Sequence, residues 1–310
     1  MISPFDLLTS DLLRYPLIIA VLIGLTAPVV GTYLVQKRLS LLGDGLGHVA
    51  LTGVAVGWLV GAWTTATPAD LLAIPGALAA SVIGALAIEY VREVSHTSRD
   101  VALAIMFYGG IAGGVVIIQL AGGTSQNLMG YLFGSLSTVT APDLVIALVL
   151  AIVVLAVGIG LSGLLAAVTG DEEFARASGL PVRAVNVLIA VMAALTVTLS
   201  MRIVGALMVS ALMIVPVAAA QQLVVGFTRT MRTAMVIAVV CALGGLLITV
   251  YVDLPPGGVI VLLTIAVYVL ALLVKPLLQR PDVRTTDPVE GSDPVDARGR
   301  GADVEASTSA

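Results

Sequence analysis

Repeated apolar stretches, each long enough to cross a lipid bilayer, are the feature that most restricts the fold of this chain. Residues 17–35, 144–164 and 259–274 are three of them, and a helix needs about 20 apolar residues to span the hydrocarbon core. Only 11% of the 310 residues are charged, whereas soluble domains carry about 25%. Because so few charges cannot solvate a surface in water, lipid must surround most of the chain. The sequence therefore predicts an all-α, polytopic transmembrane helical bundle.

The loops between the predicted spans alternate in charge. Nine candidate spans lie near residues 15–35, 43–62, 71–91, 101–120, 143–165, 184–201, 203–224, 231–250 and 257–277. Loops after the odd-numbered spans carry Lys and Arg, and those after the second, fourth and eighth carry neither, with Arg14 and Arg202 as exceptions. Because Lys and Arg concentrate on the cytoplasmic side, we expect an external N-terminus and a cytoplasmic C-terminus. If one stretch does not cross, eight spans remain and the N-terminus lies inside.

Asp44 and His48 place a carboxylate and an imidazole at the start of the second predicted span. Ionisable groups inside a membrane are costly and commonly mark functional sites. A spacing of four residues puts the two side chains on one face of a helix, one turn apart. Together they offer two ligands for a divalent cation such as zinc, iron or manganese. The alternative is structural, with Asp44 capping the helix and His48 as its ion-pair or hydrogen-bond partner.

A short helix is predicted outside the membrane, on the cytoplasmic side, between the fifth and sixth spans. Asp171, Glu172 and Glu173 are acids that suit a helix N-terminus. Gly179 can end the helix, and Pro181 prevents its continuation. A bare loop does not need such clear start and stop signals. The segment is therefore either a connecting helix or a docking element for a cytoplasmic partner.

Two pairs of glycines lie inside the fourth predicted span, Gly109-Gly110 and Gly113-Gly114. In a membrane, small residues let two helix backbones approach closely. We therefore interpret these pairs as packing faces rather than hinges.

The remaining composition limits the domain organisation and the activity. Residues 281–310 contain almost no large apolar side chain and are rich in Pro, Asp and Ser. They are predicted to form a disordered acidic cytoplasmic tail after a membrane domain of residues 1–280. The sequence has no Gly-x-x-x-x-Gly-Lys-Ser/Thr phosphate loop and no basic patch for nucleic acid. We therefore expect no enzyme activity in this chain, and energy from a partner or from an ion gradient.

Three segments together resemble the membrane permease of bacterial ABC importers for zinc, manganese or iron. The first is QKRLSLLGDGLGHVALTG at residues 36–53, which contains Asp44 and His48. The second is the acidic segment 171–179 with the Leu-Pro that follows it, and the third is IVGALMVSALMIVPVAAA at residues 203–220. The YLFG of residues 131–134 is a weaker match. One departure is Val217, where the family often has Ala, and another is the polar tail.

The resemblance implies a half-transporter that forms a homodimer in the bacterial cell membrane and works with a cytoplasmic ABC ATPase dimer. An extracytoplasmic metal-binding protein is expected to deliver the ion. Asp44 and His48 are implied to contact the transported zinc, manganese or iron, which is cargo rather than a permanently bound cofactor. The short cytoplasmic helix is implied to couple the chain to the ATPase through Asp171, Glu172, Glu173, Phe174, Ala175, Arg176 and Gly179.

A different class of function remains open at this stage. In a proton-coupled secondary transporter, Asp44 and His48 would relay protons instead of binding metal. Such a carrier would not need the capped cytoplasmic helix of residues 171–179.

Overall fold

The computed structural model describes residues 11–64, 71–94, 99–122, 125–134, 139–201, 204–252 and 254–278. Within these ranges all regular structure is helical, as the sequence predicts. The helices are α2 (Asp11–Gln36), α3 (Leu42–Trp63), α4 (Ala73–Val94), α5 (Arg99–Leu120), α6 (Ser125–Phe133), α7 (Ala141–Gly160), α8 (Ser162–Gly170), α9 (Glu172–Ala177), α10 (Val182–Ser200), α11 (Ala206–Leu223), α12 (Phe227–Tyr251) and α13 (Pro256–Leu278).

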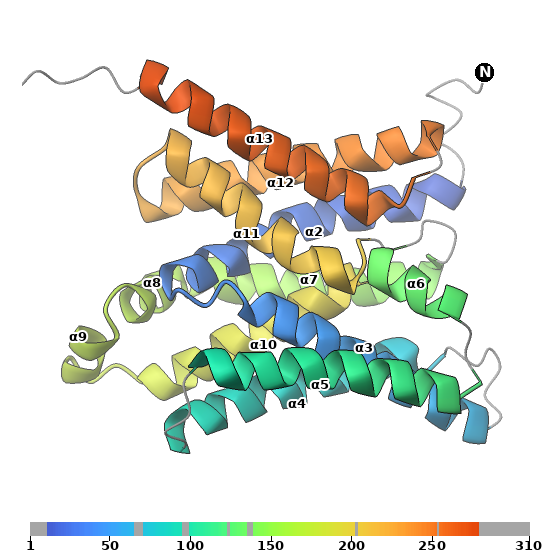
Figure 1. Ribbon diagram of the computed structural model, residues 1–310. Coiled ribbons are helices and arrows are strands. Elements are labelled where there is room, and N and C mark those ends of the chain that lie inside the picture. The colour runs from blue at the N-terminus through green and yellow to red at the C-terminus, as the bar shows by residue number, and fades with distance from the viewer. Residues whose placement is uncertain are drawn as a thin grey trace, which may run out of the picture.

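The long helices run back and forth across the bundle. In the described part of the chain, eight of them are long and apolar enough to cross a bilayer, and α11 is a shorter apolar helix. Each predicted span therefore corresponds to a helix. Helix α2 begins at one end of the bundle, whereas α13 finishes at the other end, which also carries α9 (Figure 1). This order agrees with nine passes, with α11 as the return between α10 and α12.

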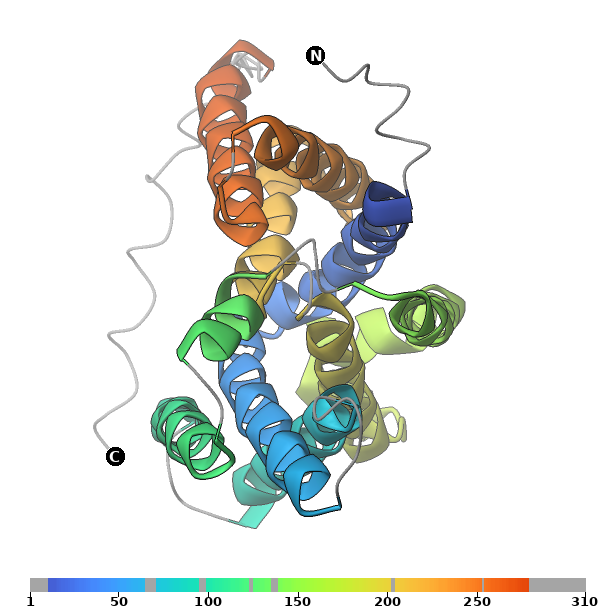
Figure 2. The same cartoon turned by 90° about the vertical axis from the view of Figure 1, so that its right-hand side faces the viewer.

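Seen along the helices, the bundle consists of two groups that meet at α2, α3, α10 and α11 (Figure 2). One group holds α2, α11, α12 and α13, and the other holds α3, α4, α5 and α10. Helix α7 packs against α2 and α10. Helices α2, α3 and α10 are the most enclosed, whereas α5, α7 and α13 expose many apolar side chains. Lipid tails are as apolar as these side chains, so the exposed faces need no polar cover.

Glycines bring α3 and α5 into backbone contact. A Cβ atom on Gly110 would lie 2.5 Å from the carbonyl carbon of His48, and one on Gly114 would lie 3.0 Å from Leu51 Cγ. The interpretation of these glycines as a packing face is confirmed at both positions. Gly109 differs, because a Cβ there would have no atom within 4 Å.

One predicted span is split between two helices in the structure. The fifth predicted span runs from residue 143 to 165, but α7 ends at Gly160 and α8 begins at Ser162. Tyr33 Oη of α2 donates a 2.5 Å hydrogen bond to the Gly158 carbonyl, which a continuous helix would pair with the Ser162 N–H. A contact with a distant helix therefore accompanies the break, and the sequence of the span does not reveal it.

Helix α6 lies in a segment that the sequence analysis treats as a loop. Its nine residues, SQNLMGYLF, are too few to cross a bilayer. The predicted acidic tail of residues 281–310 lies outside the described residues, so the two-part division of the chain stays a prediction.

Candidate functional site

A tight turn after α2 sets the point at which α3 begins. The Leu39 N–H donates to the Leu34 carbonyl at 2.9 Å, and the Arg38 N–H donates to the Val35 carbonyl at 3.1 Å. This pair of bonds defines a Schellman motif, and Leu34 and Leu39 both belong to the hydrophobic core. Arg38 occupies the position that favours glycine, with φ of +57°. The turn is thus fixed at both its backbone and its side chains.

Asp44 lies in the first turn of α3, and its carboxylate points to α11. Asp44 Oδ1 accepts a hydrogen bond from Ser210 Oγ of α11. Leu41 is the N-cap residue of α3, and no side chain caps this helix. The structural alternative in which Asp44 caps the helix is therefore wrong. The carboxylate instead joins the two helix groups, since α3 and α11 belong to different groups.

His48 lies one turn further along α3 and is almost completely enclosed. Its exposed fraction is 2%, and its ring packs edge-on against Phe107 of α5 with ring centroids 4.3 Å apart. Nδ1 of His48 is buried and has no hydrogen-bond partner among the described residues. A buried polar atom without a partner costs about 1–3 kcal/mol, so such atoms commonly have a functional explanation. The imidazole is held by packing and keeps one ring nitrogen uncommitted.

The two side chains form an open arrangement rather than a complete metal site. Among the described residues, no group of three or more His, Cys, Asp or Glu side chains could hold a metal ion. A closed four-ligand site holds zinc tightly as part of the structure, whereas an incomplete ligand set leaves positions for exchange. A carboxylate and an imidazole from one chain therefore suit an ion that passes through rather than one that stays.

Ser210 belongs to the candidate site through its hydrogen bond to Asp44, and nothing in the sequence around it marks it. It lies in the middle of an apolar segment, and only the packing of α11 against α3 brings it to Asp44. Partners that orient a ligand typically change metal affinity or activity by about 10–100-fold when they are removed.

For Ser210→Ala we expect an apparent KM for metal uptake roughly tenfold higher, because the Asp44 carboxylate loses its fixed orientation. The control is Ser200→Ala, since in the described part of the chain the buried Ser200 hydroxyl donates within its own helix, to the Thr196 carbonyl at 2.8 Å. Initial uptake rates over a range of metal concentrations measure both variants. Equal KM values for Ser210→Ala and the wild type would show that the contact does not tune the ligand.

The predicted cytoplasmic helix is present as α9, with the predicted start and stop. The Phe174 N–H donates to Asp171 Oδ1 at 2.9 Å, which makes Asp171 the N-cap. Gly179 has φ of +77°. Its N–H and that of Leu180 bond to the carbonyls of Arg176 and Ala175, at 3.1 and 3.0 Å. This is a second Schellman motif, with glycine at the position that requires positive φ.

The side chains of α9 divide into an anchoring set and an exposed set. Ala175 is 1% exposed and packs into the core, and Glu172 faces the bundle. The Phe174 side chain, in contrast, is 69% exposed at the end of the bundle that carries α9. Large exposed aromatic side chains outside the lipid are typical of protein contacts. The exposed residues of α9 and its caps are Asp171, Glu173, Phe174, Arg176, Ala177, Ser178 and Gly179.

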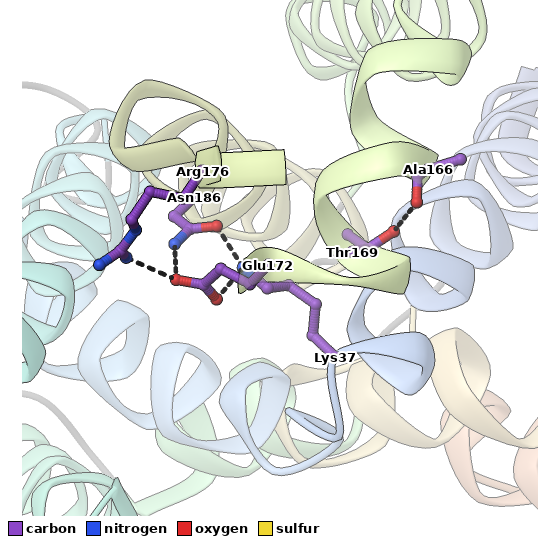
Figure 3. Close-up of polar contacts among 6 residues, drawn as sticks. All are labelled: Lys37, Ala166, Thr169, Glu172, Arg176 and Asn186. Carbon is purple, nitrogen blue, oxygen red and sulfur yellow. Dashed lines mark hydrogen bonds and ion pairs between the residues drawn. The ribbon is translucent and has the colours of Figure 1, made fainter. Parts of the chain in front are cut away.

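Glu172 connects α9 to two other elements (Figure 3). Its carboxylate lies 3.7 Å from Lys37 Nζ, at the end of α2, and 3.3 Å from Arg176. Asn186 of α10 donates to Glu172 Oε1 at 3.4 Å and accepts a hydrogen bond from Lys37 Nζ. In the sequence, Lys37 is one of the basic residues of the loop after the first span and part of the segment 36–53 that resembles the family, and nothing marks Asn186.

The comparisons with known proteins agree with this architecture. The family model described as ABC 3 transport family matches residues 9–275. The chain is 31% identical to the manganese transport system membrane protein MntC of Halalkalibacterium halodurans, over 88% of this chain and 90% of that protein. It is 29% identical to the high-affinity zinc uptake system membrane protein ZnuB of Haemophilus influenzae, over 80% and 91%. The solved structure of PsaBC from Streptococcus pneumoniae in complex with Fab matches with a TM-score of 0.78 at 25% identity, covering 88% of this chain and 96% of that one.

These matches decide between the two classes of transporter that the sequence leaves open. The family model spans nearly all of the described helices, and the relatives match over most of their own length. The predicted family is confirmed, and the proton-coupled secondary transporter is displaced. The chain belongs to the ABC 3 transport family and is the multi-pass membrane subunit of an ABC transporter, in which ATP hydrolysis resides in a partner subunit.

Proposed function

We propose that this permease imports a divalent transition metal ion, manganese, zinc or iron, and that Asp44 and His48 contact the ion as it passes. The observation that carries the proposal is the uncommitted Nδ1 of a buried imidazole, one turn from a carboxylate on the same helix. Imidazole and carboxylate are both ligands of these metals. The names of the relatives, one a manganese transport protein and one a zinc uptake protein, support a cargo of this class.

Two donors in one chain favour weak binding and rapid exchange. Metal affinity rises with the number of ligands and with how completely they are held in place. A permease must release its ion on the far side, so a closed ligand cage would slow transport. In a homodimer, the second copy would supply the same pair around a shared axis. We therefore propose that two copies of this chain form the translocation path.

The energy for transport comes from the partner ATPase, and we propose that α9 is the element on which it docks. The capped helix presents Phe174 and flanking charges away from the bundle. A dimer of the permease would engage an ATPase dimer, one subunit on each copy of α9. On the opposite side, an extracytoplasmic binding protein would deliver the metal.

Uptake with competing metals tests the cargo. The permease, its ATPase and its binding protein are expressed in cells that lack their own manganese, zinc and iron importers. We expect uptake of at least one of these ions to depend on the permease and on ATP hydrolysis by its partner. If none of the three ions accumulates above the level of cells without the permease, the proposed cargo class is wrong.

Gly179→Val tests the docking role of α9. A residue with a Cβ pays about 1–2 kcal/mol in the left-handed conformation that Gly179 adopts, so the end of α9 should distort. We expect metal-stimulated ATP hydrolysis by the assembled complex to fall severalfold.

Gly163→Val in α8 is the matched control for this substitution. A Cβ at Gly163 also has no atom within 4 Å, and the backbone there has ordinary helical φ. The complex that contains the Gly163→Val permease should hydrolyse ATP at the wild-type rate. Unchanged metal-stimulated hydrolysis in Gly179→Val would argue against a coupling role for α9.

A further inference from the structure

The contact between Lys37 and Glu172 joins the cytoplasmic docking helix to the segment that leads into the metal site. Lys37 follows the last residue of α2, and its side chain is only 5% exposed. Its hydrogen-bond partner Asn186 lies 149 residues away in the sequence and is 6% exposed. Three elements, the end of α2, α9 and the start of α10, therefore meet at one partly buried polar cluster, which we call the Lys37 cluster: Lys37, Glu172 and Asn186.

Burial makes this cluster different from an ordinary surface ion pair. Exposed pairs contribute little, because water screens them and both side chains stay mobile. The Lys37 side chain is 5% exposed and that of Glu172 is 31% exposed, and Glu172 and Asn186 are two of the partners of Lys37 on other elements. Separating Lys37 from Glu172 therefore weakens the compensation of a buried charge. The pair of Arg176 and Glu172 has the opposite character, since the Arg176 side chain is 73% exposed. Lys37 thus holds α9, and Arg176 does not.

The chain from Lys37 to Asp44 is stiff. The Schellman turn locks Arg38 and Leu39 onto the last turn of α2, and the Leu42 N–H donates to the Leu39 carbonyl at 3.0 Å. Helix α3 then starts directly, and Asp44 lies in its first turn. A displacement at Lys37 is therefore carried through the backbone to Asp44, with no flexible segment between them. The end of α8 also lies close to the end of α2, since a Cβ added to Gly170 would lie 3.4 Å from Gln36 Nε2.

We propose that Lys37 is a positioning residue of the transport cycle: through the Lys37 cluster it transmits movement of the ATPase-docked α9 to the α2–α3 turn and the Asp44–His48 pair. This inference rests on the proposed docking role of α9 and on the proposed metal contact. It assigns the mechanical link to named side chains outside the Asp44–His48 pair. Among the described residues, Lys37 is a direct side-chain connection from α9, through Glu172, and from the start of α10, through Asn186, to the segment that leads to Asp44.

The test measures the number of metal ions transported per ATP hydrolysed. The permease and its ATPase are reconstituted in liposomes with the binding protein, and uptake of Mn²⁺ or Zn²⁺, whichever the wild type transports, is followed beside phosphate release. For Lys37→Met we expect this ratio to fall about 2- to 30-fold, the range for residues that couple distant sites. ATP hydrolysis without metal should persist.

Two further variants keep the test decisive. Lys275→Met removes a lysine that bonds Gln222 at 3.0 Å and joins α13 to α11, and it should keep the wild-type ratio. If Lys37→Met does not assemble, Lys37→Met/Glu172→Gln leaves no unpaired charge in the cluster, and its ratio should fall equally.

A wild-type ratio in the variant that assembles would overturn the proposal. So would a proportional fall of uptake and hydrolysis, because that pattern means fewer intact complexes rather than lost coupling. Wild-type uptake in the same vesicles tests the proposed function separately. A wild type that transports neither ion refutes the metal cargo, whereas a transporting wild type with a fully coupled Lys37→Met refutes only the link.

Discussion

Asp44→Ala and His48→Ala should each lower metal uptake by roughly 10- to 100-fold or more, because each removes one of the two donors that one chain offers. Losses of this size already follow when only the partners of metal ligands are removed. Both substitutions shorten a side chain without adding charge, so membrane insertion and ATPase binding should persist. Metal uptake per copy of assembled complex is the measurement, with co-purification of the ATPase as the check on assembly.

Asp44→Asn separates metal contact from packing. The amide keeps the size of the carboxylate and an oxygen for Ser210, but it loses the negative charge. If Asp44 binds the ion, the Asp44→Asn permease should transport almost as poorly as the Asp44→Ala permease, because a neutral amide compensates less of the metal charge. Wild-type transport by both Asp44→Ala and His48→Ala would rule out the site assignment.

Gly110→Ala should damage transport nearly as much, although Gly110 carries no functional group. A methyl group there would lie within 2.5–2.8 Å of the His48 carbonyl carbon, carbonyl oxygen and Cβ. Backbone atoms cannot rotate away, so α3 and α5 must separate, and the 2.7 Å bond from Thr52 Oγ1 to the Gly110 carbonyl weakens. Overpacking of this kind costs about 1–3 kcal/mol, and here it also displaces the imidazole.

Gly109→Ala is the control, because it makes the same change one residue earlier. A Cβ at Gly109 meets no atom within 4 Å, so uptake and thermal stability should stay at wild-type values. Both variants are compared by metal uptake and by Tm of the purified complex. Equal behaviour of the two glycine variants would mean that the close contact between α3 and α5 does not position His48.

Local signals in the sequence were sufficient for α9. An acid at the N-cap and a glycine at the position of positive φ act within one turn of backbone, so Asp171 and Gly179 could be assigned their structural roles without a fold. The same holds for the spans, since lipid requires long apolar helices whatever their neighbours are. The break between α7 and α8 could not be predicted in the same way, because the hydroxyl that bonds to the Gly158 carbonyl belongs to Tyr33 of α2.

The candidate metal site could be predicted from the sequence only in part. The spacing of Asp44 and His48 puts them on one helix face, and that part needs only helical geometry. Whether Asp44 caps its own helix or accepts a hydrogen bond from another helix depends on Ser210 of α11, which lies 166 residues away in the sequence. Likewise, the uncommitted Nδ1 of His48 is a consequence of enclosure by α5, through Phe107 and Gly110.

By itself, then, the sequence determined the membrane setting, the spans, the capped cytoplasmic helix and the Asp–His pair, because each follows from apolar length or from backbone geometry within a few residues. Tertiary structure alone decided that Ser210 holds Asp44, that glycines seat His48 against α5, and that Lys37 ties α9 to the turn before α3. These contacts join residues far apart in the chain, and the apolar patterns of the helices that carry them do not specify which faces meet. In lipid, apolar side chains can face either a neighbour or the bilayer, so the choice of face depends on close packing and on a few buried polar contacts.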